Sequence, residues 1–468
     1  MTGQQIAGLQ AEISTLSAAH VVGRVISVQG GLLRVGGLSG SARLGDRVTV
    51  AMRGGEALAG EVLQLDATAL LVLPDAAPEG VALGDRVRLL GPATIAPSDG
   101  WIGRVIDPLG VPLDGRPLGR GAHARPLRAP PPAPSRRRPL GARLETGMAA
   151  FNTLLPIVRG QRLGLFAGSG VGKTMLLGHL ARNVEADVVV VALVGERGRE
   201  LGDFVREVLG PEGMRRTVIV AATSDRSPLV RRRCAWTAMA VAEHFRDAGK
   251  HVLLLADSVT RFAEAHREVA TAAGEMPALR GYPASVSHAI MSLCERAGPG
   301  EDGMGDITAL LTVLVAGSDM DEPVADILRG VLDGHVVLDR EIAERGRYPA
   351  IDALRSVSRS LPKAASEAEN ALISRARHLL GVYARSETMV RAGLYAEGSD
   401  SALDQAIRVW PELDAFLAAP EPGDCANSFA RLSLILRRAG GAGGGQAGAS
   451  AAGPTMAAAA RTGAVERP

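Results

Sequence analysis

The residues best suited to chemistry lie in one short stretch, residues 163–174, which reads LGLFAGSGVGKT. A glycine-rich loop between a strand and a helix lets backbone N–H groups surround a phosphate, and the helix points its positive end at the same anion. Lys173 would reach the β- and γ-phosphates of a nucleotide, and Thr174 would give its hydroxyl to Mg²⁺. The stretch therefore predicts a nucleotide site. Its residues are Ala167, Gly168, Ser169, Gly170, Val171, Gly172, Lys173 and Thr174.

The loop departs from the general pattern at its first position, where Ala167 replaces glycine. Alanine fits there if the residue ends a strand with a negative φ. Lysine usage supports a functional loop over a chance glycine-rich turn. The chain has 52 lysines and arginines together, yet lysine occurs only at 173, 250 and 363. A compact ammonium suits a phosphate loop better than a planar guanidinium does.

Carboxylates follow two other apolar runs that are predicted to be strands. Asp257 follows residues 252–256, and Glu196 follows residues 188–194. Ligands of open α/β sheets lie at the carboxyl ends of the strands. We expect Asp257 to hold Mg²⁺, mostly through water. Glu196 is placed to orient and deprotonate the water that attacks the γ-phosphorus, and Glu200 could touch a metal-bound water. A solvated charged loop over residues 195–200 is the alternative.

Three further residues are candidates on weaker grounds. Arg261 follows Asp257 closely enough to reach the γ-phosphate, and Tyr348, held by Pro349, could cover the adenine. Arg359 is a candidate arginine finger, a residue that contributes on the order of 10³–10⁵ in rate. Spacing alone favours a surface arginine at 359.

The elements that must position these residues lie in 143–362, where strands and helices alternate. Strands are predicted at 163–167, 188–194, 218–222, 252–256 and 307–315, with a helix near 231–248. Such alternation predicts a mostly parallel sheet with helices on both faces.

Residues 20–93 instead carry short β runs separated by glycines, which favour a small closed barrel. The phrase LGDRV occurs twice, at 44–48 and 83–87, and indicates equivalent turn-into-strand units. No aromatic residue other than histidine precedes Trp101, which argues against nucleic-acid binding by base stacking. An assembly role is preferred for this domain.

The remaining segments are less informative. Residues 1–19 place Ile6, Leu9, Ile13 and Leu16 on one helical face, as in a frayed terminal helix or a partner-docking helix. Residues 94–142 connect the domains, and the arginine run 136–138 is interpreted as a solvated linker, with an anionic docking patch as the alternative. Residues 363–438 are predicted to be helical and broken at Pro411, and the Gly/Ala-rich tail 439–468 to be disordered.

Composition describes an ordinary globular protein. With 468 residues the chain should hold more than one domain, and its net charge of +2 carries no acidic or basic bias. Its three cysteines have no metal or redox spacing. No apolar run reaches the roughly 20 residues of a membrane helix, and the N-terminus lacks a signal-peptide pattern. We therefore expect a cytoplasmic protein.

Together with DEPVAD at 321–326 and LDGHVVL at 332–338, these motifs closely resemble the ATPases of flagellar type III protein export, from about residue 20 to 435. This family, also called flagellum-specific ATP synthases, is related to the catalytic subunit of rotary ATP synthases, and it has its own loop variant with alanine at position 167. The resemblance implies a RecA/F1-like P-loop ATPase core between an N-terminal β-barrel and a C-terminal helical domain.

The resemblance also implies ATP and Mg²⁺ as ligands and a homohexameric ring with nucleotide between neighbouring subunits. Arg359 would act on the neighbour's nucleotide, Arg197 and Arg261 would lie near the phosphates, and Tyr348 would lie at the base. The N-terminal helix would dock a stator-like regulator. Other partners would be the export gate, chaperones and flagellar substrates, with at most peripheral attachment to the inner membrane. Departures at 284–289 and 316–318 concern coupling rather than hydrolysis.

The leading hypothesis is a Mg²⁺-ATPase that drives or primes the unfolding and export of flagellar proteins. The alternatives are an injectisome ATPase and, less favoured because the C-terminal helical part is short, a rotary ATP synthase catalytic subunit. A nucleic-acid-translocating hexamer and a catalytically silent ring scaffold are disfavoured, by the aromatic-poor barrel and by the intact set of site residues respectively.

Overall fold

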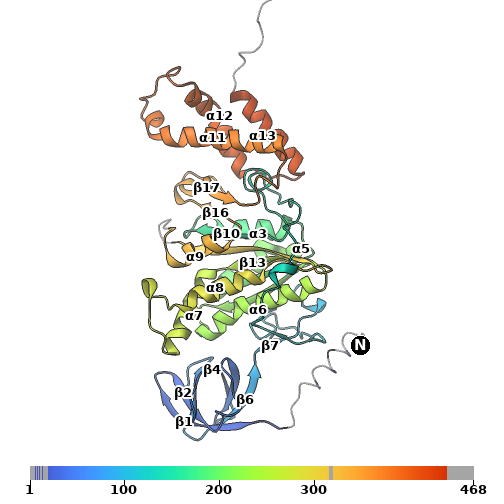
Figure 1. Cartoon of the computed structure of the whole chain (residues 1–468), viewed down its shortest axis with the longest axis vertical. Coiled ribbons are helices and arrows are strands. Elements are labelled where there is room, and N and C mark those ends of the chain that lie inside the picture. Colours follow the sequence, from blue (N-terminus) through green and yellow to red (C-terminus); the bar gives the residue numbers. More distant parts are fainter. Residues whose placement is uncertain are drawn as a thin grey trace, which may run out of the picture.

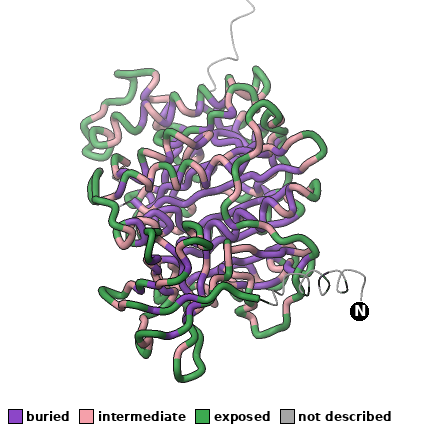
Figure 2. The backbone as a smooth tube through the Cα atoms, turned by 60° about the horizontal axis from the view of Figure 1, so that its bottom comes forward, coloured by how far each residue is buried: buried purple, intermediate pink, exposed green. Residues whose placement is uncertain are grey.

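A computed structural model of the chain describes residues 6, 8, 10, 13, 19–315 and 320–439. The chain forms a barrel, a central α/β body and a layer of C-terminal helices, which follow one another along the long axis (Figure 1). Buried residues are concentrated in the interior of the molecule and exposed residues at its periphery (Figure 2). The predicted fold class is confirmed.

Six strands close the N-terminal barrel in the order β1-β2-β5-β4-β3-β6. They are β1 (Val22–Gln29), β2 (Leu32–Gly36), β3 (Asp46–Ala51), β4 (Ala57–Leu65), β5 (Ala69–Pro74) and β6 (Arg86–Pro92). The repeated LGDRV phrases form equivalent units, because Asp46 and Asp85 each accept a 2.8 Å hydrogen bond from a backbone N–H three residues earlier. These units lead into β3 and β6, which pair with each other.

The central sheet has the order β17-β16-β10-β15-β13-β11-β12-β8. Its strands are β8 (Val105–Ile106), β10 (Arg162–Ala167), β11 (Val188–Glu196), β12 (Thr217–Thr223), β13 (His251–Asp257), β15 (Asp306–Leu314), β16 (Gly334–Leu338) and β17 (Ile351–Ser358). All are parallel except β17, which runs antiparallel to β16 at the edge, and the short β14 (Gly298–Pro299), which pairs antiparallel with β15. The five predicted strands are all present.

Helices cover both faces of this sheet. On one face lie α2 (Ala149–Asn152), α3 (Lys173–Asn183), α4 (Gly198–Asp203), the π-helical turn η3 (Phe204–Leu209) and α5 (Gly210–Met214). On the other lie α6 (Pro228–Asp247), α7 (Val259–Ala272), α8 (Ser285–Arg296) and α9 (Pro323–Val331). Alternate residues of β11 enter the two different cores, Val189 and Val191 the first, Val188 and Val190 the second. Burial on both faces explains the unbroken apolar run of that strand.

The C-terminal layer consists of α11 (Glu367–Arg391), α12 (Ser401–Ala418) and α13 (Cys425–Ala439). The predicted break at Pro411 is wrong, because α12 continues through this proline. Pro411 lies on the exposed face, where water can satisfy the carbonyl left without its helical N–H partner. The chain turns instead at residues 419–424, which contain Pro420 and Pro422.

Shorter elements complete the described chain. They are β7 (Thr94–Ile95), η1 (Asp99–Trp101), β9 (Arg125–Pro126), η2 (Pro134–Arg136), η4 (Leu279–Gly281) and α10 (Arg340–Glu344).

The barrel is fixed to the central body by buried charges. Glu61 of β4 accepts hydrogen bonds from Arg232 at 2.7 Å and from Arg233 at 2.9 Å, both on α6. Arg233 also binds Asp75 at 2.8 Å. Because Glu61 and both arginines are at least nine-tenths buried, each charge depends on its partners. We call these four residues the barrel clamp.

The arginine run 136–138 is not the solvated linker that was predicted. Arg138 binds Asp306 at 2.6 Å, at the start of β15, and Arg137 donates to the carbonyls of Glu295 and Ala297 at the end of α8. Only Arg136 stays largely exposed, against Glu301. The run therefore ties the connecting segment to the edge of the sheet at which the parallel strands begin.

The predicted docking helix and the predicted disordered tail fall largely outside the described residues. Of residues 1–18 only 6, 8, 10 and 13 are described, all in helical conformation, and the description ends at 439. Residues 316–319 are also outside it. Within the described ranges, no helix has the length and apolar character needed to cross a membrane.

Candidate active site

The phosphate loop joins the end of β10 to the start of α3, as predicted. Gly170 and Gly172 have φ of 79° and 85°, a conformation that strains residues with a Cβ. Ala167 is not among the described residues with positive φ, so an alanine fits at that position. Val171 differs from its neighbours, because its side chain is buried in the core against α3. Only its backbone is available to a ligand.

A cavity of about 1110 Å³ opens over this loop, at the edge where the parallel strands end. It brings together most of the predicted site residues. Those on its wall are Ala167, Gly168, Ser169, Gly170, Gly172, Lys173, Thr174, Glu196, Arg197, Glu200 and Arg261. These residues lie at the ends of β10, β11 and β13 or in the segments that follow these strands. Asp257, Tyr348 and Arg359 are not on the wall and are described below.

Asp257 lies directly behind Lys173. The Nζ atom of Lys173 is 2.5 Å from Oδ1 of Asp257, and the Thr312 hydroxyl donates to the same oxygen at 2.8 Å. Asp257 is almost fully buried, so this carboxylate is anchored by a cation and a hydroxyl. The structure thus places Asp257 beside the phosphate loop, where the strand-end argument expects it.

Glu196 has the electrostatic character of a general base. Burial, and then the negative charge of Asp257, raise the pKa of Glu196 to about 7, against the opposing effect of Lys173. A hydrogen bond with Glu200 acts in the same direction as burial. A base with a pKa near the working pH is both available and strong enough to take a proton.

Arginines surround the outer part of the cavity. Arg261 is bound to Glu264 at 2.8 Å, and Arg197, which is 82% exposed, pairs with Glu200 at 3.1 Å. The structure adds Arg231, which binds Glu268 at 3.0 Å, and Arg280 to the same wall. Arg231 lies in the first turn of α6, beyond the loop that follows β12, so no strand-end signal in the sequence identifies it.

Tyr348 lies against the phosphate loop. A Cβ at Gly172 would come within 3.0 Å of the Tyr348 ring, so the absence of a side chain at 172 lets the ring approach. About half of Tyr348 remains exposed. The ring is therefore accessible to a planar partner next to the loop.

Arg359 lies at the opposite edge of the sheet. It directly follows β17, whose Ser358 pairs with Gly334, and its N–H donates to the Asp333 carbonyl at 3.0 Å. Asp333 in turn binds Arg162, the first residue of β10. The phosphate loop begins five residues later along β10, about 16 Å of strand away. The exposed guanidinium donates to the Arg329 carbonyl at 3.1 Å. The chain does not bring Arg359 into its own cavity.

The donor set suits a magnesium ion. The described residues contain no group of three or more His, Cys, Asp or Glu side chains arranged to hold a metal. Mg²⁺ does not need one, because it keeps much of its water and binds one or two protein oxygens together with substrate phosphates. The Thr174 hydroxyl on the cavity wall and the anchored Asp257 carboxylate provide such oxygens.

Two family models match the chain. Residues 147–358 match the nucleotide-binding domain of the ATP synthase alpha/beta family, and residues 365–432 match the T3SS EscN ATPase C-terminal domain.

Curated relatives match over nearly their whole length. A flagellum-specific ATP synthase of Caulobacter vibrioides is 44% identical, over 92% of this chain and 99% of that protein. That of Salmonella typhimurium is 43% identical, over 91% and 96%. Among solved structures, the assembled ATPase EscN of the enteropathogenic E. coli type III secretion system gives a TM-score of 0.82 at 34% identity, covering 88% of this chain and 100% of EscN. EscN in complex with its central stalk EscO gives 0.81 at 35%, with the same coverage.

Proposed function

Because this chain belongs to the flagellum-specific ATP synthases, the type III export ATPases of the ATP synthase alpha/beta family, we propose that it hydrolyses ATP in the cavity over residues 167–174 as one subunit of a homohexameric ring. Hydrolysis would drive or prime the unfolding and export of flagellar proteins. The observation that carries the proposal is the convergence of Lys173, Asp257 and Glu196 at one edge of the sheet.

The residues of the cavity divide the chemistry among them. Backbone N–H groups of the loop and Lys173 bind the phosphates, and Glu196 orients a water in line with the γ-phosphorus and takes its proton. Arg261 and Arg197 add positive charge where the transition state gains negative charge. Mg²⁺, held by Thr174 and Asp257, would neutralise phosphate oxygens. A phosphate that reaches Lys173 competes with Asp257 for the ammonium and so releases this carboxylate for the metal.

We assign Arg359 to the cavity of the neighbouring subunit. Its position at the opposite edge of its own sheet supports this role, since it is about 16 Å of strand away from its own phosphate loop. The likeness to EscN, which was solved as an assembled ATPase, supports a ring. A head-to-tail ring repeatedly brings one edge of a subunit against the opposite edge of the next.

Mixed rings test this assignment. The Arg359→Ala variant and the Lys173→Ala variant should each lose on the order of 10³-fold or more in turnover. In a mixture, an Arg359→Ala subunit keeps its loop and can borrow Arg359 from a Lys173→Ala neighbour. About a quarter of the interfaces in an equal, random mixture would then be complete, and phosphate release should recover accordingly.

The controls are each variant alone and native mass spectrometry of the mixed rings. Absence of recovery in rings verified to contain both variants would assign Arg359 to its own subunit or to a structural role.

The membership of this chain in the family also suggests its partners. We propose that residues 1–19 dock a stator-like regulator, and that the ring works with the export gate, chaperones and flagellar substrates at the cytoplasmic face of the inner membrane. EscN was solved with a central stalk, EscO, which supports a partner for this ring as well. An injectisome role is the second candidate, because EscN is the ATPase of the type III secretion system of enteropathogenic E. coli. Deletion of the gene, scored for filaments and motility against host-cell secretion, separates the two.

A further inference from the structure

Arg359 is exposed, but its backbone is held on both sides by buried serines. The Ser358 hydroxyl donates to the Pro156 carbonyl at 2.7 Å and lies 2.8 Å from the Ser360 hydroxyl. Ser360 also donates to Pro156, at 3.3 Å, and both serines are more than 90% buried. The main chain at 358–360 is therefore anchored, and the arginine side chain alone faces outward.

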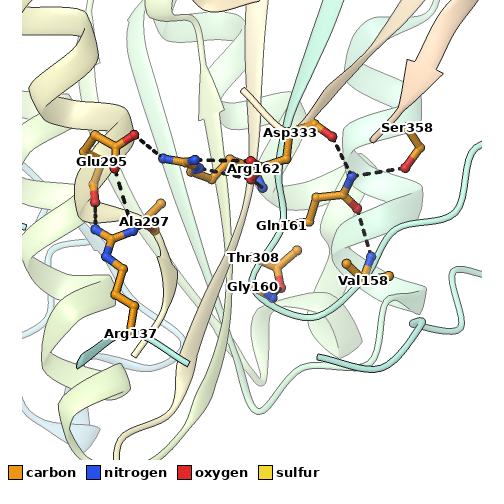
Figure 3. A network of polar contacts seen from close by, with 10 residues as sticks. All are labelled: Arg137, Val158, Gly160, Gln161, Arg162, Glu295, Ala297, Thr308, Asp333 and Ser358. Carbon is orange, nitrogen blue, oxygen red and sulfur yellow. Dashed lines mark hydrogen bonds and ion pairs between the residues drawn. The ribbon is translucent and has the colours of Figure 1, made fainter. Parts of the chain in front are cut away.

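Gln161 joins the two groups that carry this backbone. Its Nε2 donates to the Asp333 carbonyl at 3.0 Å and to the Ser358 hydroxyl at 3.1 Å, while its Oε1 accepts from the Val158 N–H at 3.0 Å (Figure 3). The Asp333 carbonyl is the acceptor of the Arg359 N–H. One fully buried carboxamide thus touches both the residue before Arg359 and the partner of its N–H.

Asp333 is itself fixed by Arg162. Its carboxylate accepts from the Arg162 backbone N–H at 3.0 Å and from Nε at 3.1 Å, and Arg162 also binds Glu295 at 2.6 Å (Figure 3). The contacts with Arg162 therefore fix the position of Asp333 independently of the hydrogen bonds that Gln161 and Arg359 donate to its carbonyl.

A buried polar network stabilises a fold little more than an apolar core of the same volume would. Its advantage is that it fixes geometry, because each donor tolerates only a narrow range of acceptor positions. A misplacement of 1 Å can cost about 100-fold in rate when the displaced group acts on a transition state. This network surrounds the backbone of Arg359, whose proposed role in the neighbouring cavity requires such accuracy.

We propose that Gln161 is a positioning residue for Arg359: its carboxamide holds the Asp333 carbonyl and the Ser358 hydroxyl so that each subunit presents its guanidinium to the next at a fixed place. This inference rests on the proposed role of Arg359. Gln161 is fully buried and is not on the wall of the cavity, so it would act only through Arg359, on the site of the neighbouring subunit.

The test replaces Gln161 by methionine, which keeps the length of the side chain and removes its hydrogen bonds. Gln161→Met should lower kcat by about 10- to 100-fold with little change in the KM for ATP, because Arg359 acts in the transition state. In the Arg359→Ala background the same substitution should lower kcat no further. Mixed with Lys173→Ala subunits, Gln161→Met subunits should recover turnover as Arg359→Ala subunits do.

Asn152→Leu is the matched control. Asn152 is an equally buried amide, bound to Thr146 and Ser428 beside the C-terminal helices, so its loss should lower the thermal midpoint and leave kcat unchanged. If Gln161→Met does not fold, Ser358→Ala removes the same hydrogen bond from the other side and takes its place.

The outcomes separate the two proposals. Additive losses in the double variant, or a loss confined to KM, would overturn the positioning role and leave that of Arg359 intact. Normal turnover in Arg359→Ala would overturn both.

Discussion

Glu196 combines a position at the end of β11 with an unusual proton affinity. Burial and the nearby Asp257 raise its pKa from an ordinary 4.5 to about 7. The folded protein therefore binds a proton at Glu196 over a pH range in which an exposed glutamate is ionised. On the proposed role of Glu196 as the base, it must be ionised to take a proton from water, so activity should be lost as the pH falls through 7.

We predict that kcat/KM for ATP falls about tenfold for each pH unit below 7, because this ratio reports the ionisation of the free enzyme. Glu196→Gln should retain ATP binding, lose on the order of 10²- to 10⁴-fold in turnover, and lose this acid limb from its residual activity. Phosphate release measured from about pH 5.5 to about pH 8.5 gives the pH profile of turnover. Nucleotide titration measures whether ATP binding is retained.

The exposed Glu212→Gln variant is the control and should keep the native profile. Unchanged turnover in Glu196→Gln would remove this residue from the role of base.

The sequence predicts which residues end strands but not which strands are neighbours. Lys173, Glu196 and Asp257 could be predicted, because each follows an apolar run and chain order alone places it at the ligand edge. Thr312 lies inside β15 and meets Asp257 only because β15 enters the sheet between β10 and β13. That order depends on packing over the whole domain, which no local pattern encodes.

At the scale of elements, the close packing of α3, the helix that follows the phosphate loop, depends on a glycine within this helix. A Cβ at Gly178 of α3 would come within 2.0 Å of Cγ1 of Val208, on the π-helical turn η3. The two elements therefore pack closely because residue 178 has no side chain. Gly381 of α11 lacks this constraint, since its nearest neighbours would be 3.5 Å and 3.9 Å away.

We predict that Gly178→Ala destabilises the protein by about 1–3 kcal/mol through overpacking. Gly381→Ala should be neutral or stabilise by up to about 1 kcal/mol, because alanine favours a helix more than glycine does. Urea unfolding followed by circular dichroism compares the two. Equal changes in stability from the two substitutions would contradict the packing argument, because helix propensity alone would then explain both.

Long elements with one pattern were predictable, whereas short or atypical ones were not. The buried run of β11 specifies a strand by itself, because both its faces are apolar. The two residues of β8 carry no period, and they form a strand only because β12 offers them a partner. Pro411 looks like a helix end in sequence, yet α12 continues through it, and its exposed position lets water bind the carbonyl left without a helical partner.

In the whole molecule, the barrel clamp joins two bodies that the sequence marks only as separate domains. Glu61 is the acceptor shared by Arg232 and Arg233, and all three side chains are buried. Loss of the shared carboxylate leaves two buried cations close together.

We predict that Glu61→Gln destabilises the protein by about 3 kcal/mol or more, since a buried charge without its partner is costly. Glu212→Gln, which removes an exposed carboxylate from a surface pair, should leave the unfolding midpoint unchanged. Thermal unfolding with tryptophan fluorescence is informative, because Trp236 lies against Arg232. A midpoint for Glu61→Gln equal to that of the wild type would mean that the clamp contributes no stability.

The two ends of β10 lie beside different reactive groups, a phosphate loop at one and Arg359 at the other. In the proposed arrangement, each subunit contributes its phosphate loop to one catalytic centre and its Arg359 to another, so an isolated copy contains no complete centre. A row of copies always has one unused loop at one end and one unused arginine at the other. Only closure of the row removes both, so a circle gains its last working centre with no change inside any subunit.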